Sequence, residues 1–430
     1  MPNKYVLIIT YYWPPAGGPG VQRWLKFCKY LPESGIIPIV YCPENPTYPI
    51  IDDSLNSEIS TDIEVIKAPI SEPYKTAGLL SKNKTKAISS GIIAKRGQQT
   101  LLERFMLFIR GNLFIPDARK SWVKPSVNIL RTIIRVRAIN CVVTTGPPHS
   151  LHLIGLQLKK ELNINWIADF RDPWTTIGYH KSLKLVPKAK KKHLKLEASV
   201  LNTADEIIVT SPSTKIEFKA KTNRPISLIT NGYDTHNIKF ETLDKAFSIA
   251  HIGSLLSERN PIILWEILSE LNRELRGFKN DLKLNFAGIV SEDVVESINN
   301  YNLSDNLNLL GYISHNDAIR YQLKTQLLLL IEIDSEATKA IIPGKLFEYL
   351  QSNRPIVALG PKGSDIETIL KSSNAGHYFN YQSKDELKNY ITTCYNKFQE
   401  GQLISHAIGI KQYSRQELTR SLTGVLTKYL

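Results

Sequence analysis

Lys345 and Glu348 stand three residues apart, a spacing that places both side chains on one face of a helix. They belong to the segment IPGKLFEYL, residues 342–350, in which a Pro-Gly turn precedes an apolar pattern of helical period. An ammonium group can pair with phosphates, and a carboxylate can accept two hydrogen bonds from the vicinal hydroxyls of a ribose. Together the two side chains could hold a nucleoside diphosphate. An exposed salt bridge between Lys345 and Glu348 is the alternative that this spacing leaves open.

A second charged segment is HIGSLLSERNP, residues 251–261, which has the pattern of a strand, a small-residue turn and the start of a helix. Arg259 would direct a fixed positive charge at a diphosphate near the start of that helix, where backbone N–H groups already favour an anion. Many strand-to-helix turns share this composition. This segment is therefore evidence for a diphosphate site only in combination with residues 342–350.

A glycine-rich loop follows the first apolar run of the chain. Gly17, Gly18 and Gly20 lie between that run and an amphipathic helix that we expect to start near Val21. Such a loop lets backbone N–H groups approach a phosphate, and the helix N-terminus adds a favourable dipole. The spacing differs from GxGxxG, which disfavours a Rossmann dinucleotide site. A flexible loop without a ligand is the alternative.

The segment DFRDPW, residues 169–174, follows a predicted strand and would lie at the carboxyl edge of a sheet, where open α/β sheets bind their ligands. Its charged residues and aromatic ring could hold sugar hydroxyls or position an acceptor. We predict acceptor contacts for Asp169, Asp172 and Trp174, and for His149, which follows a neighbouring strand. The alternatives are a structural ion-pair corner for the segment and a helix-start role for His149.

Short apolar runs alternate with helix-length amphipathic stretches along the chain, which predicts βαβ units and parallel sheets. In the first half we predict strands at Tyr5–Thr10, Ile36–Tyr41, Cys141–Thr145, Trp166–Asp169, Glu206–Thr210 and Ile226–Thr230. In the second half we predict strands at Ser248–Ile252, Leu282–Ala287, Leu307–Leu310, Leu327–Ile333 and Pro355–Leu359. A turn signal at Asn231-Gly232 marks the boundary between two domains, residues 1–230 and 231–410. Residues 411–430 are expected to include a helix that returns to the first domain.

Length and composition agree with a two-domain intracellular protein. A chain of 430 residues exceeds what one hydrophobic core usually supports. Its four cysteines are scattered without a CxxC pair, which argues against a disulfide framework and against a zinc site. The first apolar run is too short for a signal peptide, and no run approaches 18 apolar residues. We therefore predict a cytoplasmic protein.

Charge is distributed unequally between the two halves. Residues 1–230 hold 33 Lys and Arg against 17 Asp and Glu, whereas residues 231–430 hold 21 against 23. A net charge of +16 on the first half suggests an anionic partner such as nucleic acid, an anionic bilayer or a phosphorylated substrate.

Two segments of the first half suit a membrane surface. Residues 181–195 contain seven lysines and no acid, and residues 101–114 combine aromatic and aliphatic residues with arginines. We predict that they dock the first domain on the inner face of an anionic membrane. A solvated surface and an ordinary buried helix are the respective alternatives.

Taken in order, these segments resemble glycosyltransferase family 4 over nearly the whole chain. The glycine loop at 17–20 matches the family's N-terminal glycine loop, and NGYD at 231–234 resembles its NGVD sequence. Residues 253–260 resemble the family's GRLxxEKG, and Glu348 falls on the second glutamate of its E-x7-E signature.

The sequence also departs from that pattern at four positions. Ser254 stands where the family usually has arginine, and Arg259 replaces its lysine. Ala340 occupies the position of the first glutamate, and Arg171 lies nearest the position of the family's N-domain histidine. The sugar end of the donor must therefore be held by other groups.

The resemblance implies an α/β protein of the GT-B fold, with two Rossmann-like, doubly wound parallel-sheet domains facing a deep cleft. It implies a retaining transfer of a hexose from a nucleoside diphosphate sugar to a glycan or lipid-linked acceptor in cell-surface polysaccharide synthesis. No DxD motif is present, so we expect no metal and no cofactor. Arg259 and Lys345 would stabilise the charge that develops on the departing diphosphate.

These arguments give two sets of predicted site residues. The residues predicted to act in catalysis are Arg259, Lys345, Glu348 and Arg171. The residues predicted to bind the donor are Gly17, Gly18, Gly253, Ser254, Arg259, Gly344, Lys345, Leu346 and Glu348.

Two other functions remain open at this point. A relative of the same fold with different chemistry, such as a nucleotide-sugar epimerase, would use much the same donor site. A basic nucleic-acid-binding protein would account for the charge of the first half, although the basic residues are not interleaved with a recognisable recognition module. We therefore predict no nucleic-acid partner.

Overall fold

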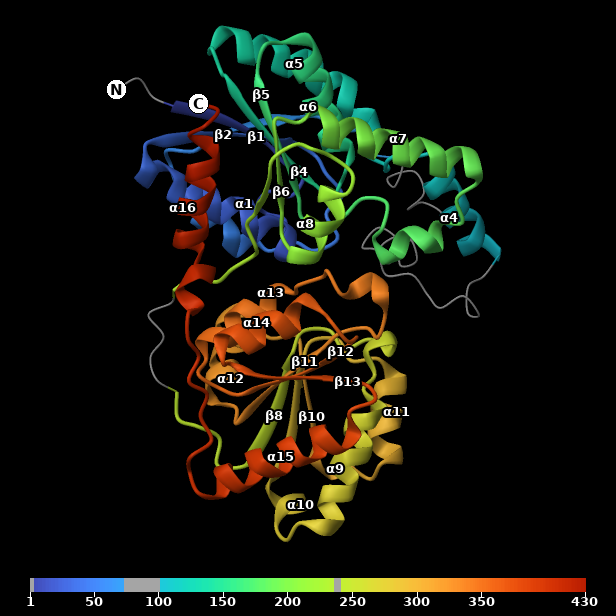
Figure 1. Cartoon of the computed structure of the whole chain (residues 1–430), viewed down its shortest axis with the longest axis vertical. Coiled ribbons are helices and arrows are strands. Elements are labelled where there is room, and N and C mark those ends of the chain that lie inside the picture. Colours follow the sequence, from blue (N-terminus) through green and yellow to red (C-terminus); the bar gives the residue numbers. More distant parts are fainter. Residues whose placement is uncertain (1–3, 73–100, 236–240) are drawn as a thin grey trace. The chain divides into compact units, whose positions relative to one another are not determined.

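The computed structural model describes residues 4–72, 101–235 and 241–430, and the chain divides into two compact units (Figure 1). The first unit comprises the chain up to Asn231 together with Arg415–Leu430, and the second comprises Gly232–Ser414. Each unit contains one parallel sheet with helices on both of its faces.

The sheet of the first unit has seven strands among the described residues, in the order β3-β2-β1-β4-β5-β6-β7. The strands are β1 Lys4–Ile9, β2 Ile36–Pro43, β3 Glu64–Ala68, β4 Cys141–Gly146, β5 Asn165–Phe170, β6 Glu206–Val209 and β7 Ile226–Leu228. The helices are α1 Pro19–Tyr30, α4 Leu101–Asn112, α5 Val123–Val136, α6 Ser150–Glu161, α7 Pro187–Thr203, α8 Pro212–Lys219 and α16 Arg415–Leu426.

The strands of this sheet are apolar on both faces, as expected where helices cover both sides of a parallel sheet. Strand β1 illustrates the arrangement, because Val6 and Ile8 join the core beneath α1 and α16 while Leu7 and Ile9 join the core beneath α5 and α6. A further cluster on that second face brings in α7 and α8. Every strand is paired in parallel, so all carboxyl ends meet at one edge.

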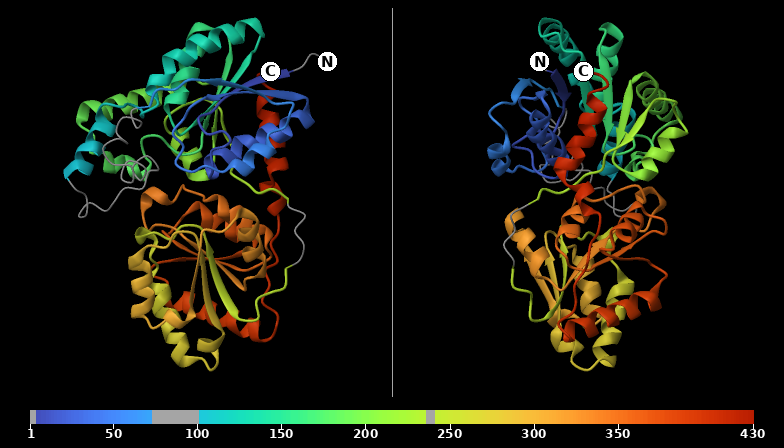
Figure 2. Two further views of the ribbon diagram at one scale, coloured as in Figure 1. Left: turned by 180° about the vertical axis from the view of Figure 1, so that it is seen from behind. Right: turned by 60° about the vertical axis from the view of Figure 1, so that its left-hand side comes forward.

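The last helix, α16, packs on the first unit, although the other residues of that unit are distant from it in the sequence. Leu418, Leu422 and Leu426 recur at four-residue spacing, and all three are buried in the same cluster as the apolar face of α1. The two helices lie side by side in Figures 1 and 2. The helix begins at Arg415, whereas Ile410–Tyr413 forms a 3-10 turn that belongs to the second unit.

The sheet of the second unit has six strands among the described residues, in the order β10-β9-β8-β11-β12-β13. The strands are β8 Phe247–Ile252, β9 Leu282–Ala287, β10 Leu307–Gly311, β11 Leu327–Ile331, β12 Ile356–Gly360 and β13 Gly376–Asn380. The helices are α9 Ile262–Glu274, α10 Phe278–Asp281, α11 Glu292–Asn300, α12 His315–Lys324, α13 Gly344–Gln351, α14 Asp365–Ser373 and α15 Lys384–Gln399. Helices α9, α11 and α15 build the core on one face, and α13 and α14 build it on the other.

The predicted fold class, two parallel-sheet α/β domains, is confirmed, and the predicted strands are present with ends that differ by a few residues. Two strands were not predicted. Strand β3 reads EVIKA and β13 reads GHYFN, and each lies at the edge of its sheet. An edge strand is only partly buried, so neither segment has the continuous apolar run by which the central strands were recognised.

Candidate functional site

Three neighbouring strands of the second sheet end in glycines with left-handed backbone conformations. Gly253 follows β8 with φ +114°, Gly288 follows β9 with φ +106°, and Gly311 ends β10 with φ +63°. A Cβ on Gly288 would lie 2.8 Å from the carbonyl carbon of Gly253, so the first two turns pack backbone against backbone. Only glycine meets both requirements at Gly288. The carboxyl edge of the sheet therefore presents bare backbone beside β8.

Lys345 lies directly over the Gly253 turn. A Cβ on Gly253 would be 2.7 Å from the Lys345 Nζ, which stands 3.2 Å from Nε2 of His251. The other ring nitrogen of His251, Nδ1, is 3.0 Å from the carbonyl oxygen of Leu329. Because a carbonyl can only accept, Nδ1 carries the ring proton and Nε2 accepts from the lysine. His251 belongs to β8, so the central strand of the sheet fixes where Lys345 lies.

The electrostatics of this edge favour an incoming anion. Burial, together with the charges of Lys345 and Arg259, holds the pKa of His251 well below its ordinary value. Burial and the neighbouring Arg259 lower the pKa of Lys345 to about 7, against the opposing effect of Glu348. The edge thus gathers two basic side chains and a neutral imidazole. A bound anion would relieve the repulsion between the two basic groups.

Arg259 is only partly satisfied by the protein. It ends the 3-10 turn Ser257–Arg259 that follows β8, and its side chain is half-buried. Within the described part of the chain its Nε is buried and has no hydrogen-bond partner. A buried donor without an acceptor costs about 1–3 kcal/mol. An anionic ligand would supply that acceptor.

Glu348 and Lys345 have different partners. Gln322 of α12 donates a hydrogen bond from Nε2 to a Glu348 carboxylate oxygen at 3.0 Å, whereas Lys345 is bonded to His251. The exposed salt bridge considered above is therefore not how either residue is held. The next residue, Tyr349, is fully buried, and its hydroxyl accepts from the N–H of Ile252 at 3.0 Å. That bond ties α13 to the end of β8 and fixes the helix that carries Lys345 and Glu348.

The other predicted donor residues divide between surface and core. Ser254 is exposed beside Gly253, and Gly344 opens α13 with free space where a Cβ would stand. Leu346 is fully buried in the core beneath α13, so only its backbone could meet a ligand. The prediction that Leu346 binds the donor is therefore limited to its backbone.

Sequence reasoning missed Glu332, which follows β11 at the same edge and is 6% exposed. Tyr378 donates to its Oε2 at 2.7 Å and Ser364 donates to its Oε1 at 3.1 Å. Burial raises its pKa to about 7, although these hydrogen bonds and the charge of Arg259 act in the opposite direction. The signal was available, because an acid interrupts an apolar run at the end of a strand. It was overlooked because that run was read as one strand, Leu327–Ile333.

In the first unit Asp169 is an interior anchor. It is fully buried, and its carboxylate accepts two hydrogen bonds from Arg23, at 2.9 and 3.2 Å. Trp24 donates to it at 2.7 Å and Thr145 at 2.8 Å. Although burial alone would raise its pKa, Arg23 and these hydrogen bonds hold the pKa below its ordinary value. Its oxygens are occupied by the protein itself, which corrects the prediction that Asp169 contacts an acceptor.

Trp174 and His149 are likewise interior residues, 1% and 4% exposed. Their rings stack in parallel at 5.0 Å, and the Trp174 indole donates to Nδ1 of His193 at 3.2 Å. Burial, followed by the charges of nearby His152 and Arg171, holds the pKa of His149 well below its ordinary value. The prediction that the two side chains contact an acceptor is corrected by their burial.

Arg171 and the glycine loop are close together. An Arg171 guanidinium nitrogen donates to the carbonyl oxygen of Gly20 at 3.0 Å, and another donates to that of Pro147. A Cβ on Gly20 would lie 2.8 Å from this guanidinium, so the two groups are in close contact. Gly17 is bonded through its N–H to the carbonyl of Ile50.

Gly18 and Asp172 are the predicted residues of the first unit that remain open to a ligand. Gly18 has φ +88° and caps α1, which begins at Pro19 rather than near Val21. Asp172 is half-buried, and burial raises the pKa of its carboxyl against the effect of Arg171.

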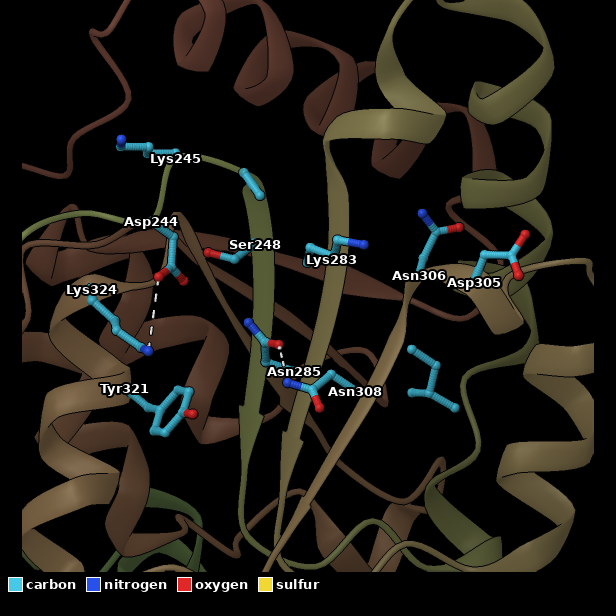
Figure 3. A pocket seen from close by; sticks show the side chains of 12 residues that line it. Asp244, Lys245, Ser248, Lys283, Asn285, Asp305, Asn306, Asn308, Tyr321 and Lys324 are labelled. Atoms are coloured by element: carbon cyan, nitrogen blue, oxygen red, sulfur yellow. Dashed lines mark hydrogen bonds and ion pairs between the residues drawn. The ribbon is translucent and has the colours of Figure 1, made fainter.

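A pocket lies at the opposite edge of the second sheet. It has a volume of about 420 Å³ and is lined at the amino ends of β8, β9 and β10 by Ser248, Lys283 and Leu307 (Figure 3). Asn308 donates to Asn285 within it at 3.1 Å. Open α/β sheets bind ligands at their carboxyl ends, so this polar pocket is not the predicted donor site.

Two absences hold for the residues that the structure describes. No group of three or more His, Cys, Asp or Glu side chains is arranged to hold a metal ion. Among the same residues, no helix is both long enough and apolar enough to cross a bilayer.

Comparison with solved structures identifies the fold. A sucrose-phosphate synthase from Thermosynechococcus elongatus has a TM-score of 0.59 and 14% sequence identity, with 99% of this chain and 98% of that chain covered. The chain has the GT-B fold. No protein-family model matches the sequence, and no curated protein matches it significantly.

Two further solved structures share this GT-B architecture over almost their whole length. S. aureus TarM, solved in complex with fondaparinux, alpha-GlcNAc-glycerol and UDP, has a TM-score of 0.60 and 12% identity over 98% of this chain and 99% of that chain. Anabaena HepE in complex with UDP and glucose has a TM-score of 0.59 and 13% identity, again over 98% of this chain and 99% of that chain. At such identity the likeness concerns the fold.

Proposed function

We propose that the protein is a retaining glycosyltransferase that moves a hexose from a nucleoside diphosphate sugar to a glycan or lipid-linked acceptor in cell-surface polysaccharide synthesis. The observation that carries this proposal is the pair of basic groups at the carboxyl edge of the second sheet. Arg259 has a buried donor without a partner, and Lys345 lies over the bare Gly253 turn. Two GT-B neighbours, TarM and HepE, were solved in complex with UDP, which agrees with a diphosphate at such an edge.

In this proposal each charged residue of the predicted donor site has a task. Arg259 and Lys345 stabilise the negative charge that grows on the departing diphosphate, and the backbone beside Gly253 adds N–H groups. Glu348, held by Gln322, accepts hydrogen bonds from the ribose hydroxyls. These two positive charges take the place that a magnesium ion would fill, so metal independence remains part of the proposal.

The acceptor belongs in this proposal to the first unit. Asp169, Trp174 and His149 are interior residues, so Asp172 is the remaining acidic candidate for contact with acceptor hydroxyls. Arg171 acts by positioning, because its bonds to the carbonyls of Gly20 and Pro147 fix the glycine loop beside the DFRDPW segment.

Ligand-induced stabilisation tests the donor site. We expect one nucleoside diphosphate among UDP, GDP, ADP and dTDP, and its sugars, to raise the thermal unfolding midpoint, since a ligand that binds only the folded state stabilises it. Arg259→Ala and Glu348→Ala should each remove this shift and abolish turnover while leaving the fold intact. The exposed Arg273→Ala and Glu296→Ala serve as matched controls and should behave like the wild type. A near-normal rate in Arg259→Ala or Glu348→Ala would refute the assignment.

The acceptor dependence of the reaction separates the proposal from an epimerase. A transferase releases the nucleoside diphosphate in proportion to added acceptor, whereas an epimerase on the same fold converts the donor sugar without one. We expect release to depend on an added glycan or lipid-linked saccharide. Conversion of the donor sugar in the absence of any acceptor would favour the epimerase.

We further propose that the first unit docks on an anionic membrane through the α4/α7 surface, which comprises α4, residues 113–114, Lys184–Val186 and the first half of α7. Asn112 at the end of α4 donates to the carbonyl of Lys184 and accepts from the N–H of Val186 at 2.8 Å, which joins the two helices. The exposed lysines of this surface are Lys184, Lys188, Lys190, Lys191, Lys192 and Lys195. The exposed apolar side chains beside them are Phe105, Phe108, Leu113, Val186 and Leu194.

Sedimentation with liposomes tests this docking surface. The wild type should sediment with vesicles of phosphatidylglycerol but not with phosphatidylcholine at low salt, because each lysine near the surface contributes about 1 kcal/mol. Replacing Lys188, Lys190, Lys191 and Lys192 by Gln should abolish the difference. A variant with four exposed lysines of the second unit replaced, Lys283, Lys362, Lys371 and Lys397, has the same net charge and should still bind.

Two results would contradict the membrane proposal. One is equal sedimentation of the wild type with both kinds of vesicle. The other is salt-sensitive binding to nucleic acid, lost in the first lysine variant, in the absence of vesicle binding.

A further inference from the structure

His251 is a buried side chain at the donor edge to which the proposed reaction assigns no task. It is fully buried in β8, the strand that ends at the Gly253 turn. A buried polar side chain in the middle of a parallel sheet is costly unless both of its polar atoms are used. Both are used here, one by the carbonyl of Leu329 and one by Lys345.

The two contacts of His251 are not interchangeable. The Leu329 carbonyl belongs to the neighbouring strand β11, so it holds the Nδ1 proton and fixes the plane of the ring. In the tautomer that donates to Leu329, the Nε2 lone pair faces Lys345, whose Nζ lies over Gly253, and the backbone of Ser254 also interacts with the ring. The Nε2 of His251, whose ring is held by the Leu329 carbonyl, thus determines the position of the Lys345 Nζ.

We propose that His251 is a positioning residue: its Nε2 accepts from Lys345 and holds that side chain over the Gly253 turn, so that Lys345 takes up a proton when a diphosphate arrives. This inference rests on the proposed donor site, and it adds a task for a residue outside the predicted set.

The groups that face Lys345 make this proton uptake reasonable. They are the neutral His251 from β8, Arg259 from the 3-10 turn after β8, and Glu348 from its own helix. Burial and Arg259 hold the pKa of Lys345 near 7, so above that pH the free protein carries mostly neutral lysine. A diphosphate beside Nζ favours the ammonium form and raises this pKa.

The sign of the pH dependence follows from this linkage. Below pH 7 Lys345 is already protonated in the free protein, so diphosphate affinity does not depend on its titration. Between pH 7 and the higher pKa of the complex, binding takes up one proton, and affinity falls by about tenfold per pH unit. The phosphate groups themselves titrate near pH 6 and stay constant above pH 7.5.

Calorimetric titration of UDP, or of whichever panel nucleotide binds most tightly, measures both quantities between pH 7.5 and 9.5. The wild type should lose affinity by about tenfold per pH unit, and buffers of different ionisation enthalpy should report uptake of one proton. Lys345→Arg cannot deprotonate in this range, so its affinity should be independent of pH.

Two substitutions at His251 separate positioning from packing. His251→Asn keeps an amide N–H near Nδ1 for the Leu329 carbonyl but lacks an acceptor that reaches Lys345. His251→Gln places its amide oxygen near Nε2 and restores that acceptor. We expect His251→Asn to weaken UDP binding at pH 7.5 by about tenfold, and His251→Gln to recover most of this loss, with both variants still showing a cooperative thermal unfolding transition.

The outcomes distinguish failure of this inference from failure of the proposed function. If the wild type binds none of the panel nucleotides, the donor site itself is wrong. If the wild type binds without pH dependence, proton uptake at Lys345 is refuted. If His251→Asn and His251→Gln bind UDP equally well, His251 serves packing alone. Should either variant fail to fold, the wild-type and Lys345→Arg titrations still decide the proton uptake.

Discussion

Both sheets carry charged residues at or near the carboxyl ends of their strands, but Asp169 of the first unit and Arg259 of the second differ in how far the protein satisfies them. In the first unit Asp169 receives hydrogen bonds from Arg23, Trp24 and Thr145 and is fully buried. In the second unit Arg259 keeps a buried Nε without a partner among the described residues, and Lys345 is bonded to a neutral imidazole.

The extent to which the protein fills a group's hydrogen-bonding capacity separates structural charges from charges that can bind a ligand. A group whose hydrogen-bonding capacity is filled by its own chain stabilises the fold and has nothing to offer a ligand. A basic group that lacks acceptors and lies near another basic group is stabilised when an anion binds, because the anion supplies the acceptor and reduces the repulsion. Asp169 is satisfied by its own chain and the Nε of Arg259 is not, so satisfaction by the protein is what distinguishes these two charges.

Asp169→Ala should have the largest effect on stability. It removes the partner of a buried guanidinium, a change that costs about 3–5 kcal/mol because Arg23 is left charged and unpaired. Urea unfolding measures the loss, with the half-buried Asp172→Ala as the matched control expected to lose under about 1 kcal/mol. Equal losses in the two variants would contradict the assignment of Asp169 as the interior anchor.

Glu332→Gln should have an intermediate, pH-dependent effect. The folded-state pKa of Glu332 is raised to about 7 from an ordinary value of 4.5, so the folded state binds more protons than the unfolded chain between these pH values. The free energy of unfolding of the wild type therefore falls as pH rises through this window, by up to about 3 kcal/mol.

Glutamine has no such titration, so Glu332→Gln should match the wild type near pH 4.5 and exceed its stability at pH 8. Urea unfolding at both pH values measures the difference. The exposed Glu296→Gln on α11 is the control and should follow the wild type at both. A variant that is less stable than the wild type at pH 8 would show that the carboxylate is satisfied as Asp169 is.

Arg259→Ala should have the smallest effect on stability, within about 0.5 kcal/mol in the absence of ligand, since its partly buried side chain is not satisfied by the protein. In the presence of a nucleoside diphosphate it should lose about 1.5–3 kcal/mol of ligand-induced stabilisation, the value of a hydrogen bond to a charged group. Thermal unfolding with and without UDP separates the two. A large loss without ligand would place Arg259 with Asp169 among the anchors.

Much of the fold could be predicted because the central strands are buried on both faces. A run such as LLLLI in β11 has to be apolar throughout, and that requirement is visible in the sequence. Strands β3 and β13 escaped prediction because an edge strand pairs on one side only and tolerates polar residues. Their existence depends on the neighbouring strand that offers hydrogen bonds.

The candidate site was predictable to a similar degree. Local spacing brought Gly253 and Arg259 to one turn and Lys345 and Glu348 to one helix, and parallel pairing of β8 with β11 predicts that such turns share an edge. Spacing gave no sign of His251 or Glu332 as partners, since each is bonded to residues far along the chain.

By itself the sequence determined the α/β fold class and the positions of the charged turns, because apolar periodicity and turn residues act over a few positions. Only the tertiary structure decided which of those charges are already neutralised. Asp169 meets Arg23 across 146 positions of sequence, and Lys345 meets His251 across 94. Whether a buried charge is satisfied depends on atoms within about 3 Å, and folding alone brings those atoms together.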